Sequence, residues 1–189
     1  MKKIFFVLVF ISTVSSVTAQ NNIIGFDLTL YLNRVKIKYE RVLSDRYTIG
    51  SQSTIFYGWF PGFQLAPIGR MYFKKDAPEG FYAQGKICMG IFQSGHQSVV
   101  SGEEKTQIFS NFGAGFAFGY QWLLGDNKQW SVDLSLGLKF VGSVPIYGSM
   151  GNSWDELLNA WHTIPGNTAW RLFGPGSFVD TLFTVGYRF

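Results

Sequence analysis

The chain has 189 residues, of which 18% are aromatic and only 15% are charged, whereas about a quarter are charged in ordinary soluble domains. This composition excludes intrinsic disorder, and the length fits one domain. A single cysteine and two histidines exclude a disulfide scaffold and a zinc cluster. The net charge is +4, but the basic residues are not clustered, so we expect no nucleic-acid binding. We also expect no cofactor.

The first 19 residues have the organisation of a secretory signal peptide. Lys2 and Lys3 precede an apolar run from Ile4 to Ile11, and small residues end the segment at Ala19. The apolar run is too short for a membrane-spanning helix, which needs about 20 residues. We therefore expect cleavage after Ala19 and one mature domain over residues 20–189.

Beyond the signal, apolar residues alternate with small or polar ones, which predicts β-strands with two different faces. Eight such segments follow one another, most of them as long as the roughly 9 to 11 residues that a membrane-crossing strand needs. They lie at residues 24–32, 35–41, 47–58, 65–73, 81–91, 112–122, 130–140 and 178–189.

The connections between these segments differ in length. Short polar connections at 44–46, 74–80 and 123–129 alternate with longer ones at 95–106 and 142–175. Short turns on one side and long loops on the other are typical of an outer-membrane barrel. We predict an all-β, eight-stranded, antiparallel, up-and-down transmembrane β-barrel that is monomeric, surrounded by outer-membrane lipids, with its termini and short turns in the periplasm. A soluble barrel with an apolar interior is the structural alternative.

The charged residues of the strands fall on the polar face, and only Arg41 lies on the apolar one. A charge that faces lipid costs about 2 to 4 kcal/mol at mid-membrane, so this distribution favours the membrane barrel. An eight-stranded barrel is just wide enough for its side chains to fill it, which predicts a plugged interior with a nearly neutral charge network. Its predicted members are Asp27, Lys36, Lys38, Glu40, Arg70, Lys86, Asp133, Lys139, Asp180 and Arg188.

Bulky aromatic residues gather near the ends of the predicted strands, as in the interfacial girdles of membrane barrels. Those expected on the turn side are Tyr47, Phe73, Phe81, Trp122, Trp130 and Phe189. Those expected on the opposite side are Trp59, Phe60 and Phe178.

The last strand carries Phe183, Val185 and Tyr187, spaced by two, before the final Phe189. This ending resembles the C-terminal signature of outer-membrane proteins, which implies the barrel assembly machinery and periplasmic chaperones as transient partners. Further stretches resemble small Bacteroidetes-type outer-membrane barrels, some of which carry only a label of unknown function. These stretches are residues 39–41, 69–73, 77–82 and 119–122.

Two features of the predicted long loops bear on function. His96 and Ser98, with Glu103 or Glu104 nearby, are similar to the His-x-Ser arrangement of outer-membrane lipid A deacylases, in which a histidine activates a serine. That pair lies on a lipid-facing strand in the deacylases, whereas here the polar surroundings favour an ordinary solvated loop.

The last long loop is predicted to contain a short helix. Ser153 and Glu156 form a capping box, and an apolar face with helical spacing follows it. This helix either folds over the barrel mouth or serves as a membrane-surface or partner-docking segment. The residues of its apolar face are Trp154, Leu157, Leu158 and Trp161.

Together these features predict a non-enzymatic envelope protein with a structural or surface-interaction role and a possible protein partner at its loops. A lipid-modifying enzyme that uses His96 and Ser98, and a small-solute channel, are the alternatives.

Overall fold

A computed structural model of the chain describes residues 21–28, 34–57, 60–97, 104–142, 170–171 and 174–189. It is all-β over these residues and contains eight strands. The expected signal peptide and the expected loop helix at 153–162 lie outside the described residues. The strands are β1 (Asn22–Asp27), β2 (Arg34–Val42), β3 (Tyr47–Phe56), β4 (Gly62–Tyr72), β5 (Gly80–Gln97), β6 (Glu104–Leu124), β7 (Trp130–Val141) and β8 (Val179–Arg188).

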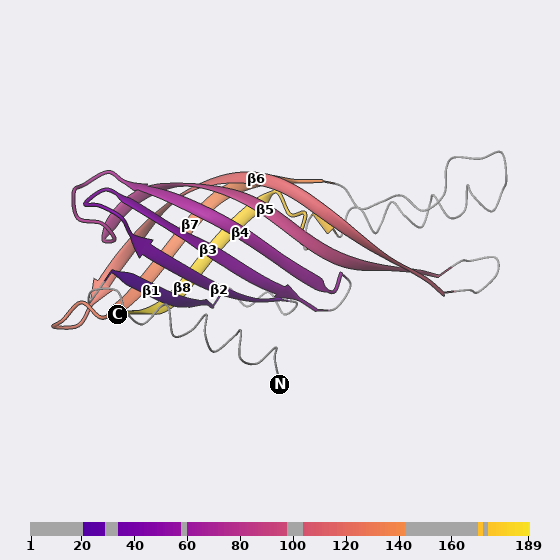
Figure 1. The fold of residues 1–189 in the computed structure, drawn as a ribbon, viewed down its shortest axis with the longest axis horizontal. Coiled ribbons are helices and arrows are strands. Elements are labelled where there is room, and N and C mark those ends of the chain that lie inside the picture. The colour runs from indigo at the N-terminus through magenta and orange to yellow at the C-terminus, as the bar shows by residue number, and fades with distance from the viewer. Residues whose placement is uncertain (1–20, 29–33, 58–59, 98–103, 143–169, 172–173) are drawn as a thin grey trace, which may run out of the picture.

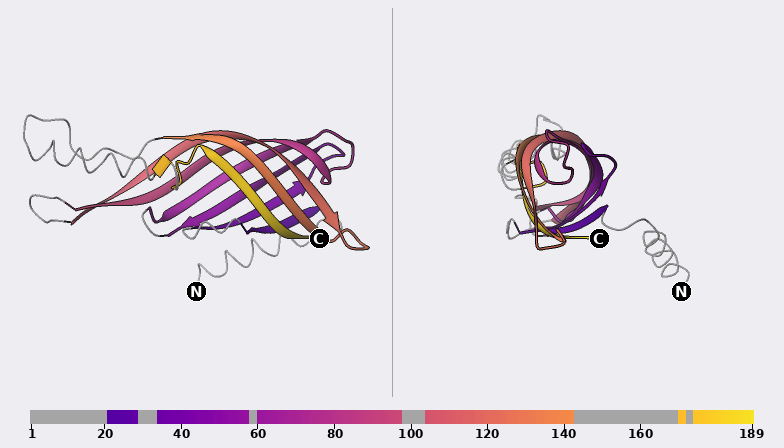
Figure 2. Two further views of the ribbon diagram at one scale, coloured as in Figure 1. Left: turned by 180° about the vertical axis from the view of Figure 1, so that it is seen from behind. Right: turned by 90° about the vertical axis from the view of Figure 1, so that its left-hand side faces the viewer.

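The eight strands form one closed barrel in which each strand pairs with its neighbours in sequence. Every pairing is antiparallel, and β1 closes the ring by pairing with β8 from Ile23↔Arg188 to Asp27↔Thr184. Figure 2 shows the ring along its axis. The predicted eight-stranded, antiparallel, up-and-down barrel is therefore confirmed.

The short connections and the C-terminus lie at one end of the barrel (Figure 1). The backbone N–H of Asn22 donates to the carbonyl of Phe189 at 3.0 Å, and the N–H of Phe189 donates back at 2.9 Å. Gly125, with a φ of 88°, begins the β6–β7 turn in a conformation that favours glycine. We call this the turn end of the barrel.

The two faces of the barrel wall differ in chemistry. Large apolar side chains are exposed along all eight strands, such as Ile91, Phe112 and Leu136, each more than 60% exposed. In contrast, Lys38 and Glu40 are fully buried inside the barrel. The interior thus holds the charges and the exterior is apolar, which contradicts the alternative of a soluble barrel with an apolar interior.

The β5–β6 hairpin extends beyond the other strands at the end opposite the turns (Figure 1). The pairing of β4 with β5 ends at Gly62↔Phe92, but β5 and β6 remain paired with each other as far as Gln97↔Glu104. The predicted loop at 95–106 is therefore wrong at both of its ends. Its polar residues belong to a two-stranded ribbon that continues beyond the barrel wall. In this ribbon the backbone groups of β5 and β6 pair with each other, so no further strand is needed there.

Candidate functional site: the filled interior

Four charged side chains meet in the middle of the barrel, and we call them the central ion-pair network: Lys38, Glu40, Arg70 and Asp133. The ammonium of Lys38 lies 3.0 Å from Glu40 Oε2 and 2.7 Å from Asp133 Oδ2. The guanidinium of Arg70 lies 2.9 Å and 2.8 Å from the same two oxygens. All four side chains are fully buried. Each charge thus contacts both opposite charges, and the network is neutral, as a buried ionic group must be to persist.

Uncharged side chains complete the hydrogen bonding around Arg70. Its Nε donates to Gln84 Oε1 at 2.8 Å, and its Nη1 donates to Gln121 Oε1 at 2.9 Å. The guanidinium carbon lies 4.1 Å from the centroid of the Tyr82 ring, which is a cation–π contact. Because Arg70 is on β4 and its partners come from β2, β5, β6 and β7, this one residue connects most of the barrel wall.

The two carboxylates also accept hydrogen bonds from hydroxyl groups. Tyr72 and Thr48 donate to Glu40 Oε1 at 3.0 Å and 2.6 Å, and the Tyr82 hydroxyl donates to Asp133 Oδ1. These residues were not named from the sequence, because only charged residues were considered for the interior network. The inward position of Tyr72 was predictable, since Tyr72 lies two residues from Arg70 on the same face of β4.

Replacing Tyr82 by phenylalanine is expected to lower the free energy of unfolding by about 1.5 to 3 kcal/mol, because a hydrogen bond to a buried carboxylate is lost. Urea unfolding in detergent micelles or lipid bilayers measures this difference. Tyr120→Phe on the same hairpin serves as the control, because Tyr120 packs among aromatic rings on the exterior. Equal effects of the two substitutions would contradict the assignment.

A second group of charges lies farther from the turn end, and we call it the upper charge cluster: Asp27, Lys36, Lys86, Lys139 and Asp180. The ammonium of Lys36 lies 3.1 Å from Asp27 Oδ2, and Lys86 pairs with Asp180. Lys139 is 2% exposed. The structure thus divides the predicted network into two groups. Arg188, the tenth predicted member, is half-buried at the turn end.

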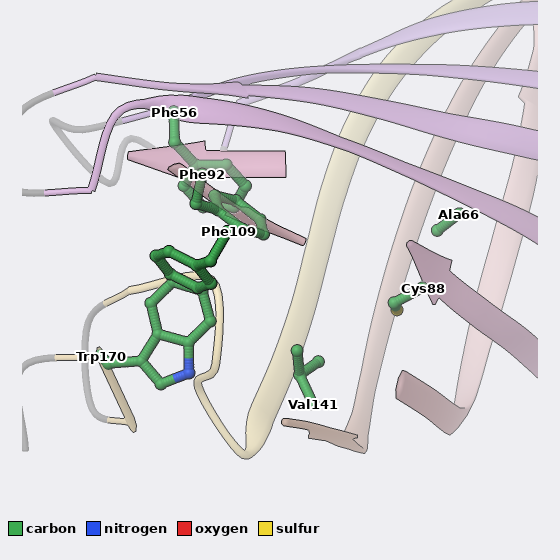
Figure 3. Packing of buried hydrophobic residues seen from close by; sticks show 7 residues of the cluster. All are labelled: Phe56, Ala66, Cys88, Phe92, Phe109, Val141 and Trp170. Atoms are coloured by element: carbon green, nitrogen blue, oxygen red, sulfur yellow. The ribbon is translucent and has the colours of Figure 1, made fainter. Parts of the chain in front are cut away.

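A buried hydrophobic cluster with four aromatic rings lies in the interior; Figure 3 shows Phe92 and Phe109 between Phe56 and Trp170. Trp170 is fully buried, and its ring centroid lies 5.1 Å from that of Phe92 and 5.5 Å from that of Phe109. Its indole N–H donates to the carbonyl of Gly142 at 3.0 Å. Phe60 packs on Trp170 with a centroid distance of 5.2 Å. Phe60 is therefore part of this interior cap and not of the exterior girdle expected for it.

The remaining girdle residues that the structure describes are exposed on the exterior. The turn-side residues and Phe178 all have more than a third of their surface exposed, whereas Trp59 lies outside the described residues. Of the predicted C-terminal signature, Phe183, Tyr187 and Phe189 are exposed on the exterior and Val185 is half-buried beside them.

The structure describes only one of the three candidate catalytic residues. His96 is in β5, where its backbone pairs with that of Lys105, and Ser98 and Glu103 lie outside the described residues. The four residues of the predicted loop helix also lie outside them. No group of three or more potential metal-binding side chains occurs in the part of the chain that the structure describes.

Comparisons with models of protein families, with curated proteins and with solved structures found no match to this chain. Within the described ranges, no helix is long and apolar enough to cross a membrane.

Proposed function

We propose that this chain is an integral outer-membrane β-barrel protein with a plugged interior and a non-enzymatic role in the cell envelope. The supporting observation is the closed barrel with an exposed apolar exterior and buried charges. Water would make that exterior an aggregation surface, whereas lipid solvates it. The expected signal peptide, the C-terminal signature and the resemblance to small Bacteroidetes-type barrels agree with this location.

Cell fractionation combined with gel migration tests the proposed location. We expect the protein in the outer-membrane fraction, cleaved after Ala19, with a migration on SDS gels that changes on heating because the folded barrel resists the detergent. A soluble periplasmic protein with heat-independent migration would contradict the proposal.

A structural or surface-interaction role is favoured by the shape of the barrel at the end opposite the turns. The β5–β6 hairpin projects there as a two-stranded ribbon, with Ile108 71% exposed. Exposed strand edges offer backbone groups for pairing with another chain. Cross-linking from Ile108 in intact envelopes, followed by mass spectrometry, identifies such a partner. Products found equally from Leu136, which is on the barrel wall, would argue against a specific interaction.

The filled interior argues against the channel alternative. The central ion-pair network and the aromatic cap occupy the barrel in succession, and the members of both are buried except Phe60, which is half-buried. In planar bilayers we therefore expect no discrete conductance steps from the purified protein. Regular steps that persist in independent preparations would support the channel.

The deacylase alternative predicts a change in lipid A that the proposed function does not. We expect the mass spectrum of lipid A to be the same in cells with the native protein, with Ser98→Ala and without the protein. Loss of one acyl chain that requires both His96 and Ser98 would replace the proposal by an enzymatic one.

A further inference from the structure

The upper charge cluster contains more positive than negative charge. Its members are three lysines and two aspartates, and the four side chains that form its two ion pairs are at most 5% exposed. The carboxylate of Asp27 forms an ion pair with Lys36, and that of Asp180 forms one with Lys86. In contrast, the central ion-pair network has two cations and two anions, each paired twice. The excess positive charge is therefore local to the upper cluster.

Lys139 carries this excess. It is 2% exposed, and none of the ion pairs found among the described residues includes it. Lys36, Lys86 and Arg34 act on it with like charge, and within the described ranges Asp180 is the carboxylate that attracts it. That carboxylate is already paired with Lys86.

The strand register brings Lys86 and Lys139 to the same level of the interior. Lys86 pairs with Gly115 across β5 and β6, and Gly115 pairs with Lys139 across β6 and β7. A Cβ atom at position 115 would lie 2.9 Å from the Cβ of Lys139. Glycine at this position thus lets β6 lie close against Lys139, with Lys86 on the other side of the same strand.

The neighbours along the strands cannot neutralise the charge. Cys88 and Val141, each two residues beyond one of the lysines, belong to the buried hydrophobic cluster. In the other direction the central network is already balanced. An uncompensated buried ammonium is costly, and an ammonium offers three N–H donors and no acceptor. A small anion meets both requirements.

We propose that the upper charge cluster binds a small inorganic anion of the halide class between Lys86 and Lys139. A halide accepts hydrogen bonds from any direction, so two ammonium groups on strands separated by one strand can share it. The anion balances the third lysine and separates the like charges of Lys86 and Lys139. The site depends on the barrel interior alone and does not rest on the proposed location of the protein.

Crystals of the full-length mature barrel grown in sodium bromide test the site directly. We expect an anomalous peak within hydrogen-bonding distance of the Nζ atoms of Lys139 and Lys86. Two results would overturn the proposal: no peak at this position, or density for a carboxylate side chain of the protein in its place.

Thermal unfolding of the detergent-solubilised barrel gives an independent test. At constant ionic strength, replacing gluconate by chloride is expected to raise the unfolding midpoint, by about 5 to 10 °C at a hundredfold excess over the dissociation constant. Lys139→Met should abolish this dependence. Lys128→Met, which removes the same charge from an exposed turn lysine, should keep it. A chloride dependence that is absent in the native protein or unchanged in Lys139→Met would overturn the proposal.

Discussion

Replacing Arg70 by methionine is expected to lower the free energy of unfolding by about 3 to 5 kcal/mol, the cost of removing one partner from a buried ion pair. Without the guanidinium, Glu40 and Asp133 share Lys38 as their one cation in the central network. Gln84 also loses the donor that its carbonyl oxygen accepts from, and Gln121 loses one of its donors but keeps Lys38. Urea unfolding of the barrel in lipid vesicles, followed by tryptophan fluorescence, measures the change.

Two further variants separate the charge effect from a general loss of packing. Lys128→Met breaks the exposed pair with Glu79, whose atoms lie 2.7 Å apart, and should cost at most about 1 kcal/mol. Adding Glu40→Gln to Arg70→Met restores charge balance in the network and should recover part of the lost stability. If the double variant were as unstable as the sum of its single variants, the ionic explanation would fail.

Replacing Leu136 by arginine is expected to lower the stability of the barrel in lipid bilayers by about 2 to 4 kcal/mol, because the new charge faces the middle of the membrane. Leu136 lies midway along β7 and is 63% exposed on the exterior. An exposed leucine in a water-soluble protein would tolerate the same change within about 0.5 kcal/mol. The magnitude therefore distinguishes the two solvents.

Leu124→Arg is the matched control for this prediction. Leu124 is also exposed on the exterior, but it ends β6 at the turn end of the barrel. Near the interface the same charge should cost only about 0 to 1 kcal/mol. Equal costs at the two positions would contradict a membrane-embedded wall.

The period-two pattern predicted which charged side chains of the central network point inward. It placed Lys38, Arg70 and Asp133 on the polar face, and the structure has them buried together. It did not predict that Arg70 would meet Glu40 and Asp133, which are on β2 and β7. Those contacts depend on how the strands shift relative to each other when the barrel closes, and alternation along one strand contains no information about that shift.

The interior cap shows a second limit of prediction from the sequence. Trp170 follows a long connection and enters the barrel mouth, where Phe60 packs on it. In the sequence, Trp59 and Phe60 follow a predicted strand, as girdle residues do. Aromatic residues at that level of a barrel can be on either face of the wall, and the sequence alone does not distinguish the two faces. Gly176 lies directly against this ring, since a Cβ at this position would lie 2.0 Å from the indole nitrogen of Trp170.

The solvent in contact with the barrel wall can be measured position by position along β7. In a Cys88→Ala background, single cysteines at residues 134, 135, 136 and 138 carry a nitroxide spin label, and the labelled barrels are reconstituted in lipid bilayers. We predict that labels at Leu134, Leu136 and Leu138 collide with oxygen dissolved in the lipid, whereas the label at Ser135 does not. Preferential collision of labels at the three leucine positions with a water-soluble nickel chelate would contradict a lipid-facing exterior.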